Sequence, residues 1–292
     1  MNFNSRRMTA FLAEALLEDQ ATRDATTLAT IDPQQKAMAT IIAKQDCVLA
    51  GIALVRRIYE VFAEIEGGAH GYPEVRIPQE IFDGVNLHKG ENVASIRHSA
   101  RVLLSCERLI LNLLQHLSGI ATVTRAYVDA VDDTGARILD TRKTVPGLRR
   151  LEKYAVRCGG GHNHRLDLSD GILVKNNHID LAGGVRTAIE RVLANRKGEQ
   201  PVEVEVRNML ELEAALKYGA ESILLDNMTP EQTRAAVAVI RGGAPAMKIE
   251  SSGGITLENV RLYAEAGVDF ISIGALTHSA SAVDLSMRIE AA

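Results

Sequence analysis

The chain has 292 residues, 46% hydrophobic and 24% charged, a composition typical of soluble globular proteins and unlike that of disordered or fibrous chains. The formal net charge of −4 lacks the basic excess of most nucleic-acid-binding proteins, so we expect no nucleic-acid partner. Three cysteines without a Cys-x-x-Cys spacing favour neither a disulfide framework nor a zinc cluster, and they predict a reducing compartment, the cytoplasm.

The first 19 residues predict an amphipathic helix, because Met8, Leu12 and Leu16 recur at helical spacing. Glu14 interrupts the apolar run and no small-residue cleavage pattern follows, so a secretion signal is disfavoured. No stretch of the chain approaches the ~18 uninterrupted apolar residues that a membrane span requires. We therefore expect no membrane partner.

The sequence pattern of residues 1–118 is typical of a mixed α/β region. Residues 47–55, 61–65 and 91–97 have strand-like composition, and glycine-rich turns lie between them. A long helix is predicted over 99–117, with Ser99 as its N-cap. We expect these residues to form a layer separate from the rest of the chain.

After residue 135, short apolar runs alternate with helical patterns. The runs are 137–140, 171–175, 202–206, 222–226, 247–251 and 270–274, and the helical candidates are 149–157, 181–196, 208–218, 230–241 and 256–266. Strand followed by helix, repeated in this way, predicts a parallel sheet with right-handed crossovers. The strands are too few for an eight-stranded barrel, which favours a smaller or incomplete one. A doubly wound open sheet stays open as an alternative, although no G-x-G-x-x-G follows the first strand of this half.

Most of these predicted strands end in a polar residue. The strand-end residues are Asp140, Lys175, Glu205, Asp226, Glu250 and the Ser272/Gly274 pair. One such residue by itself is more often the solvated flank of a loop. Because ligands bind at the carboxyl ends of parallel strands, the whole set predicts a site at this edge of the sheet.

Positive charge is concentrated between residues 140 and 180, where eight Lys/Arg face five Asp/Glu in an otherwise acidic chain. A solvated charged face would explain the count alone. The order of residues favours a site, because Arg142-Lys143 follows a strand and a triple glycine leads into His164-Arg165. Planar Arg forks beside a mobile Lys charge predict a pocket for a small polyanion, such as a phosphate or a polycarboxylate.

Two glycine-containing loops follow the last two predicted strands, within residues 248–255 and 272–278. Loops at this place in a barrel commonly bind phosphate through backbone N–H groups and a helix N-terminus. Glu205 and Asp226 end consecutive strands, so their carboxylates could face one cation or one diol. The alternative is that both carboxylates cap the helices that follow.

Several segments together resemble the quinolinate phosphoribosyltransferase family, from about Thr26 to His278. They are ERLILNLLQHLSGIAT, DTRKTVPGLR, GGGHNHRLDLSDGILVKNNH, EVEV, LLDNM, ESSGGI and SIGALTHS. The resemblance implies an α/β fold in which an N-terminal α/β sandwich, residues 1–118 completed by 279–292, precedes an incomplete, six-stranded parallel α/β barrel, residues 119–278, that holds the active site. It implies that quinolinate and 5-phosphoribosyl diphosphate (PRPP) give nicotinate mononucleotide, pyrophosphate and carbon dioxide with Mg²⁺, in de novo NAD synthesis. It also implies a homodimer or higher homo-oligomer that shares its active sites.

The resemblance also implies roles for individual residues. For quinolinate it implies Arg108, acting across the subunit interface, and Arg142, His164 and Arg165. It implies four catalytic residues: Lys143, Lys175, Glu205 and Asp226. Lys143 would lie near the ring nitrogen or the pyrophosphate, and Lys175 would also contact the anionic substrates. Glu205 and Asp226 would bind ribose hydroxyls and magnesium. For the 5-phosphate it implies Ser252, Gly253, Gly254, Gly274 and His278.

Two other functions stay open. A relative could use the same phosphoribosyl donor on a different acceptor, such as nicotinate, although Arg108, Arg142, His164, Arg165 and Lys175 are more cations than one carboxylate needs. A non-catalytic protein that binds a sugar phosphate should lack the metal-type carboxylates or the lysine beside Arg142, and this chain has both.

Overall fold

The structure is a computed structural model that describes residues 1–68 and 71–292. These residues divide into two units, each with its own sheet. The first unit comprises residues 1–122, 157–159 and 280–292, and the second comprises residues 123–156 and 160–279. Within the described residues, no helix is both long and apolar enough to span a membrane.

The first unit combines helices with a small antiparallel sheet. Its elements are α1 (Arg6–Glu18), η1 (Ala21–Arg23), α2 (Ala25–Thr30), β1 (Lys36–Ala43), β2 (Cys47–Val48), α3 (Ala53–Ile65), β3 (Glu74–Arg76), β4 (Asn86–Leu87), β5 (Asn92–Ser99), the start of α4 (Ala100–Ala130) and β12 (Leu285–Ala291). Helix α1 confirms the predicted amphipathic helix: Met8, Leu12 and Leu16 are buried, and the Ser5 hydroxyl accepts a hydrogen bond from the Met8 amide at 3.3 Å.

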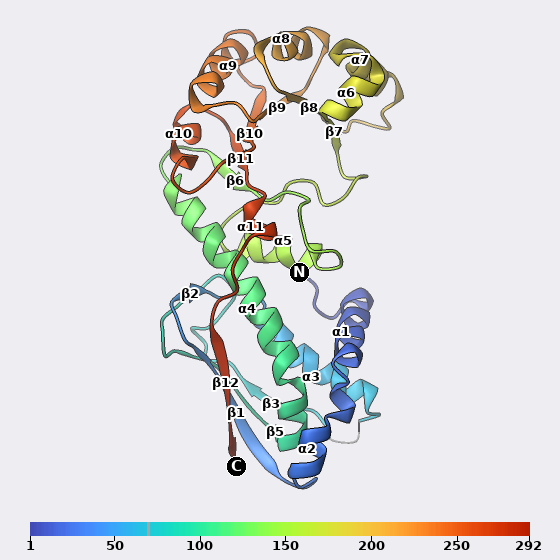
Figure 1. The fold of residues 1–292 in the computed structure, drawn as a ribbon, viewed down its shortest axis with the longest axis vertical. Coiled ribbons are helices and arrows are strands. Elements are labelled where there is room, and N and C mark those ends of the chain that lie inside the picture. The colour runs from blue at the N-terminus through green and yellow to red at the C-terminus, as the bar shows by residue number, and fades with distance from the viewer. Residues whose placement is uncertain (69–70) are drawn as a thin grey trace. The chain divides into compact units, whose positions relative to one another are not determined.

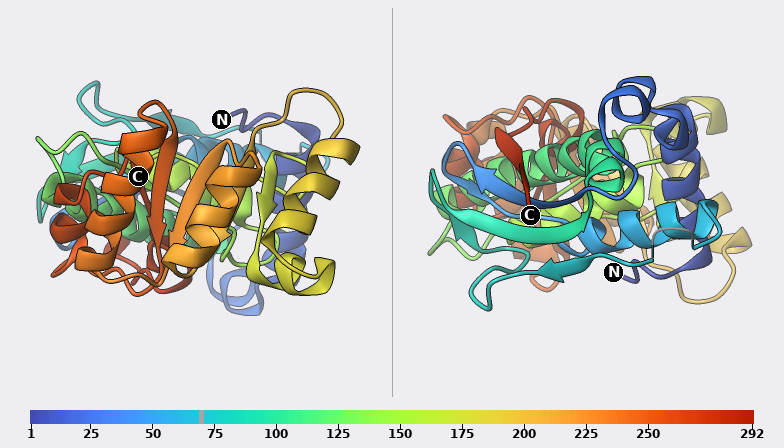
Figure 2. Two further views of the ribbon diagram at one scale, coloured as in Figure 1. Left: turned by 90° about the horizontal axis from the view of Figure 1, so that it is seen from above. Right: turned by 90° about the horizontal axis from the view of Figure 1, so that it is seen from below.

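The four-stranded sheet of this unit has the order β12-β1-β5-β3, and β1 and β5 lie side by side in it (Figure 2, right). Strand β1 alternates between buried and more exposed residues, as expected for a strand that covers a core on one face only. Its antiparallel partner β12 comes from the C-terminus, with Ala37 opposite Ala291 and Ala43 opposite Leu285. The last strand of the chain therefore belongs to the sheet of the first unit.

The predicted strand at 61–65 is wrong, because these residues belong to helix α3. The predicted strand at 47–55 survives only as Cys47–Val48. The apolar run is buried at helical spacing, with Leu54, Ile58 and Phe62 all on the inner side. Short apolar runs do not distinguish a strand from a buried helix, and the helical period becomes visible only when the two segments are read as one.

Helix α4 extends further than the predicted 99–117. Ser99 is the last residue of β5, and its buried hydroxyl has no hydrogen-bond partner among the described residues, so the predicted N-cap is wrong. The helix runs past residue 122, the end of the first unit's long segment, and its later turns belong to the second unit.

The second unit alternates strands and helices, and Figure 1 shows α6 to α10 along the outer side of its strands. After α4 its elements are β6 (Arg137–Leu139), α5 (Arg149–Cys158), β7 (Ile172–Val174), α6 (Asn176–Ala182), α7 (Val185–Asn195), β8 (Val202–Val206), α8 (Met209–Tyr218), β9 (Ser222–Asp226), α9 (Pro230–Gly243), β10 (Lys248–Ser252), α10 (Val260–Glu265), β11 (Phe270–Ser272) and α11 (Ala275–His278).

All six strands of this sheet are parallel, in the order β6-β11-β10-β9-β8-β7. Within the described chain the two end strands, β6 and β7, do not pair, so the barrel is incomplete, as predicted. The helix predicted over 181–196 begins instead at Val185, as α7, and residues 181–182 are the end of α6. Gly183 and Gly184 separate the two helices, because both have positive φ angles, 89° and 122°, which end one helix and reorient the chain for the next.

Candidate active site

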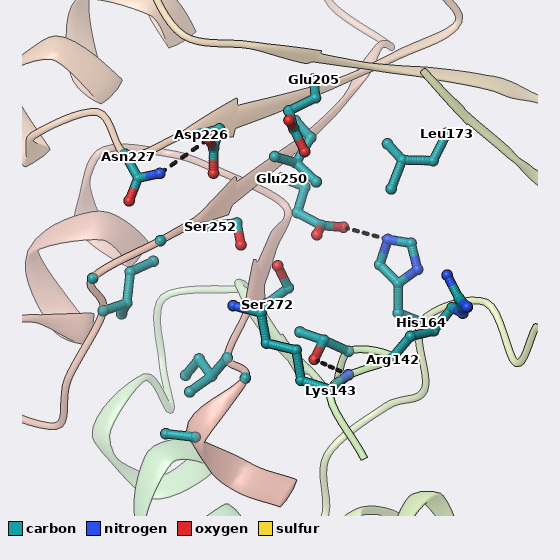
Figure 3. A pocket seen from close by; sticks show the side chains of 18 of the residues that line it. Arg142, Lys143, His164, Leu173, Glu205, Asp226, Asn227, Glu250, Ser252 and Ser272 are labelled. Atoms are coloured by element: carbon teal, nitrogen blue, oxygen red, sulfur yellow. Dashed lines mark hydrogen bonds and ion pairs between the residues drawn. The ribbon is translucent and has the colours of Figure 1, made fainter. Parts of the chain in front are cut away.

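A pocket of about 650 Å³ lies at the carboxyl ends of the parallel strands and is lined entirely by residues of the second unit. This volume is within the usual range for small-molecule sites, about 300–1,000 Å³. Figure 3 shows ten labelled side chains that line it. Of the predicted site residues, the lining contains Arg142, Lys143, His164, Arg165, Lys175, Glu205, Asp226, Ser252, Gly253, Gly254, Gly274 and His278.

The strand register explains the polar floor of this pocket. Two rows of residues lie opposite one another across the strands: Glu205, Leu224 and Glu250 form one row, and Asp226, Ser252 and Ser272 form the next. Alternate residues of a strand point to the same face, so both rows face the pocket. Glu205 and Asp226 thus share a face but lie one row apart rather than directly opposite each other.

The loop after β6, with Arg142 and Lys143, and the segment between α5 and β7, with Arg165, supply the cations of one wall. The Nε of Arg142 is buried and has no hydrogen-bond partner within the described chain. Burial, and then the charge of neighbouring Arg142, lower the pKa of Arg165. The two positively charged guanidinium groups repel each other in this partly buried wall. An anion bound between them would relieve the repulsion, so the wall favours anion binding. The Lys143 carbonyl accepts a hydrogen bond from the Thr277 hydroxyl at 2.7 Å, which ties this loop to α11.

Lys175 and Glu205 pair at one side of the pocket, with 3.4 Å between Nζ and Oε2. Glu205 also accepts a hydrogen bond from the Asn176 amide at 3.3 Å, at the first residue of α6. The lysine side chain is about half exposed (48%), whereas the carboxylate is buried (7%). Lys175 is therefore free to move towards an anionic ligand while Glu205 stays in place.

The two loops predicted to bind phosphate line the pocket through Ser252, Gly253, Gly254 and Gly274. Gly253 has a φ of 92°, and a Cβ at this position would lie 2.3 Å from the Asn227 Oδ1. Asn227 donates a hydrogen bond from Nδ2 to Asp226 at 3.0 Å, and its amide donates to the Ser252 carbonyl at 2.8 Å. Only glycine thus allows the loop after β10 to lie against the residue that holds the Asp226 carboxylate.

Glu203 and Asn227 were not predicted from the sequence, and Glu250 was named only as a strand-end residue without a role of its own. Nε2 of His164 lies 3.3 Å from Glu203 and 3.5 Å from Glu250. Burial, and then the charge of Glu203, raise the pKa of Glu250 to about 7. The VEVEV alternation at 202–206 is a signal for Glu203, because it places Glu203 and Glu205 on one face.

The strand-end residue Asp140 does not line the pocket. It is fully buried and forms an ion pair with Lys153, which is also buried. Its carboxylate also accepts hydrogen bonds from the Asn163 amide group at 2.6 Å and from the His164 backbone amide at 2.9 Å. Asp140 thus supports the segment that carries His164 and Arg165 rather than meeting a ligand.

Arg108 is the one predicted site residue outside the lining. It is an exposed residue of α4 in the first unit. Its predicted place in a site contributed by a second copy of the chain stays a prediction.

Comparisons with known proteins place the chain in one family. The family profile described as quinolinate phosphoribosyl transferase, N-terminal domain, matches residues 24–118, and the profile for the C-terminal domain matches residues 120–288. The nicotinate-nucleotide pyrophosphorylase [carboxylating] of Mycobacterium leprae is 44% identical over 267 residues, which cover 91% of each chain. A probable nicotinate-nucleotide pyrophosphorylase [carboxylating] of Bacillus subtilis is 40% identical and covers 98% of this chain and 94% of its own.

Among solved structures, the crystal structure of NadC from Streptococcus pyogenes matches with a TM-score of 0.91 at 39% identity. The match covers 100% of this chain and 99% of the other. Both profiles, the relatives and the solved structure extend over nearly the whole sequence and agree with one another. This chain is a member of the quinolinate phosphoribosyltransferase family, the nicotinate-nucleotide pyrophosphorylases (carboxylating).

Proposed function

We propose that this chain is a pentosyltransferase that converts quinolinate and PRPP to nicotinate mononucleotide, pyrophosphate and carbon dioxide in NAD biosynthesis. Family membership supports the reaction. The observation that supports this reaction most directly is the composition of the pocket. Arg142, Lys143 and Arg165 line one wall, and the carboxylates of Glu205 and Asp226 line the same pocket. Cations on one side suit a dianionic acceptor, and hard oxygen atoms on the other suit a metal-bound sugar diphosphate.

The acceptor would bind at the Arg142 and Arg165 end of the pocket, beside His164. Each guanidinium is a planar fork that pairs with a carboxylate through two hydrogen bonds, and quinolinate carries two adjacent carboxylates. Lys143, from the same loop as Arg142, would lie near the reacting ring nitrogen or the departing pyrophosphate. Lys175 would supply a further mobile charge to the anionic substrates.

The donor would occupy the opposite end. Ser252, Gly253, Gly254 and Gly274, with His278 beside them, would surround the 5-phosphate, and Glu205 and Asp226 would face the ribose hydroxyls. The two carboxylates also fit Mg²⁺, because they are hard oxygen donors on one face of neighbouring strands, and few such ligands suit an ion that arrives with a phosphate. When bound, Mg²⁺ would neutralise charge on the leaving pyrophosphate.

The reaction requires mainly that the protein positions the two substrates. The pyridine nitrogen forms a bond to the anomeric carbon of the ribose while the bond to pyrophosphate breaks, and the ring becomes cationic. This ring accepts the electron pair released when the adjacent carboxylate leaves as carbon dioxide, and a proton from solvent takes the vacated place. No covalent nucleophile is required, and orientation of reactants can contribute about 7–11 kcal/mol.

Carbon dioxide release tests the function directly. Purified protein with quinolinate, PRPP and Mg²⁺ should release carbon dioxide and form nicotinate mononucleotide, whereas nicotinate in place of quinolinate should give little product. Arg142→Ala and Arg165→Ala should each raise the KM for quinolinate at least about tenfold, with little change for PRPP. Efficient turnover of nicotinate would instead favour a different acceptor.

The magnesium assignment has its own test. The double variant Glu205→Gln, Asp226→Asn keeps the size of both side chains but removes both charges. It should lose Mg²⁺-dependent turnover and also the Mg²⁺-dependent part of PRPP binding, measured by calorimetry. Retained rates would refute the assignment.

We further propose that the protein works as a homodimer or higher homo-oligomer, in which Arg108 reaches the quinolinate site of a second copy. The exposed position of Arg108 on α4 supports this proposal. An Arg108→Ala chain mixed with an Arg142→Ala chain should recover part of the activity through hybrid oligomers. No recovery, despite subunit exchange shown by mass spectrometry, would contradict a shared site. We also propose a reducing compartment, the cytoplasm, because the sequence has only three cysteines and no Cys-x-x-Cys spacing.

A further inference from the structure

Two glutamates at the acceptor end of the pocket, Glu250 buried and Glu203 partly buried, have no role in the proposed function. Glu203 lies on β8 and Glu250 on β10, and both meet one ring nitrogen, Nε2 of His164, at 3.3 and 3.5 Å. Figure 3 shows the contact between Glu250 and the imidazole. The side chains are little exposed, 17% for Glu203 and 4% for Glu250. Oε1 of Glu250 has no hydrogen-bond partner among the described residues.

The backbone on either side of the imidazole is fixed as well. The His164 amide donates to the Asp140 carboxylate at 2.9 Å, and the His164 carbonyl accepts from Lys153 Nζ at 3.0 Å. The ring therefore reaches the two glutamates from a rigid segment. Because the next residue is Arg165, any rotation of the ring also disturbs the segment that carries this guanidinium.

The three side chains have the composition of a metal site, and their ligand atoms lie within 4.8 Å of one another. The other ring nitrogen argues against a metal. A metal-bound histidine carries its proton on the second nitrogen and donates it to an acceptor. Here Nδ1 of His164 accepts a hydrogen bond from the Arg165 amide at 2.8 Å, so Nδ1 is unprotonated and Nε2 carries the proton.

We propose that Glu203 and Glu250 are positioning residues for acceptor binding: they hold His164 as the Nε2–H tautomer and thereby fix the Arg165 amide through Nδ1. Both ring nitrogens are then used within the protein, and the imidazole meets the acceptor through its carbon edge or face. The specificity for a dianionic acceptor comes from Arg142 and Arg165, held at a fixed place, rather than from a charged histidine. This inference rests on the proposed function for the identity of the acceptor, but its central claim about the tautomer does not.

The tautomer is read directly by NMR. Protein labelled with ¹⁵N-histidine, with the His164 signals identified by their loss in His164→Gln, should show Nε2 protonated and Nδ1 unprotonated at neutral pH. An Nδ1–H tautomer, or an imidazolium with both nitrogens protonated, would overturn the proposal. So would binding of one equivalent of Zn²⁺ that is lost in His164→Gln.

Kinetics test the positioning role. Glu203→Ala and Glu250→Ala should raise the KM for quinolinate by about tenfold, the effect of losing one charge-assisted hydrogen bond, and should leave the KM for PRPP within about twofold. Glu203→Gln and Glu250→Gln keep an acceptor oxygen for Nε2–H, so they should recover most of the loss. Equal effects on both substrates would contradict the proposal, as would an effect on kcat alone.

Asp269→Asn is the matched control. Asp269 immediately precedes β11 at the amino end of the sheet, where it pairs with Arg241 and with Lys248, the first residue of β10, and it does not line the pocket. Its replacement should leave both KM values unchanged even if it lowers stability. A wild-type protein without activity on quinolinate would refute the proposed function, yet the NMR result would still decide the tautomer.

Discussion

Removal of Lys153 should strongly destabilise the second unit, because it would leave the Asp140 carboxylate buried without its counter-charge. Asp140 is 0% exposed and Lys153 is 3% exposed. Burial raises the pKa of Asp140, and the contact with Lys153 acts in the opposite direction. Without the lysine, the carboxylate keeps only its neutral donors from Asn163 and His164. For Lys153→Met we expect a loss of about 3–5 kcal/mol in the free energy of unfolding, as for other broken buried ion pairs.

Urea unfolding followed by far-UV circular dichroism measures this loss, since the chain contains no tryptophan for fluorescence. Asp140→Asn combined with Lys153→Met removes both charges, so the double variant should be more stable than the sum of the two single losses by about 1–3 kcal/mol. Arg186→Met serves as the control, because its pair with Glu190 is exposed on α7 and its loss should change the free energy of unfolding far less. A cost below about 1 kcal/mol for Lys153→Met, or strict additivity, would refute this reasoning.

Two further predictions concern the pocket. Gly253→Ala should raise the KM for PRPP at least about tenfold, because its Cβ would lie 2.3 Å from the Asn227 Oδ1 and displace the partner of Asp226. Gly135→Ala is the control: its φ of 81° gives a similar backbone strain, but no atom lies within 4 Å of the new Cβ and the residue does not line the pocket, so the KM for PRPP should not change. Equal effects would assign the change to backbone strain alone. Burial raises the pKa of Glu250 from 4.5 to about 7, so its contribution to stability is present below pH 4.5 and is lost as the pH rises through 7. Glu250→Gln should remove this part of the pH dependence, at most about 3 kcal/mol, and an unchanged profile in thermal unfolding from pH 5 to 8 would contradict the assignment.

The strands of the second unit were predictable because they are short, buried and rich in β-branched residues, with turn residues on either side. Strands β8 and β9 begin and end where the sequence predicted, at 202–206 and 222–226. The place of the pocket followed from the topology, since parallel strands bring their carboxyl ends together, whereas the roles of individual residues came from the family resemblance.

What the sequence did not reveal depends on contacts distant along the chain. Asp140 has the same strand-end position as Asp226, and only the packing of α5 against it distinguishes a buried ion pair from a pocket residue. The role of Glu250 depends on a histidine 86 positions earlier, carried by an irregular loop whose path no periodicity predicts. Asn227 has a left-handed backbone conformation, with a φ of 54°. Its contact with the loop of Gly253 could not be predicted, because the two residues are distant along the chain.

The pairing of β12 with β1 has a consequence for how the protein is made. Strand β1 is synthesised long before its neighbour on one side, because Ala37 pairs with Ala291. Until then, one edge of β1 presents unpaired N–H and C=O groups, which can pair with other nascent chains. The parallel sheet of residues 123–279 is synthesised in between and can fold during translation. Protection of the N-terminal sheet from aggregation thus waits until β12 has been synthesised, and deletion of Leu285–Ala291 would expose that edge of β1 permanently.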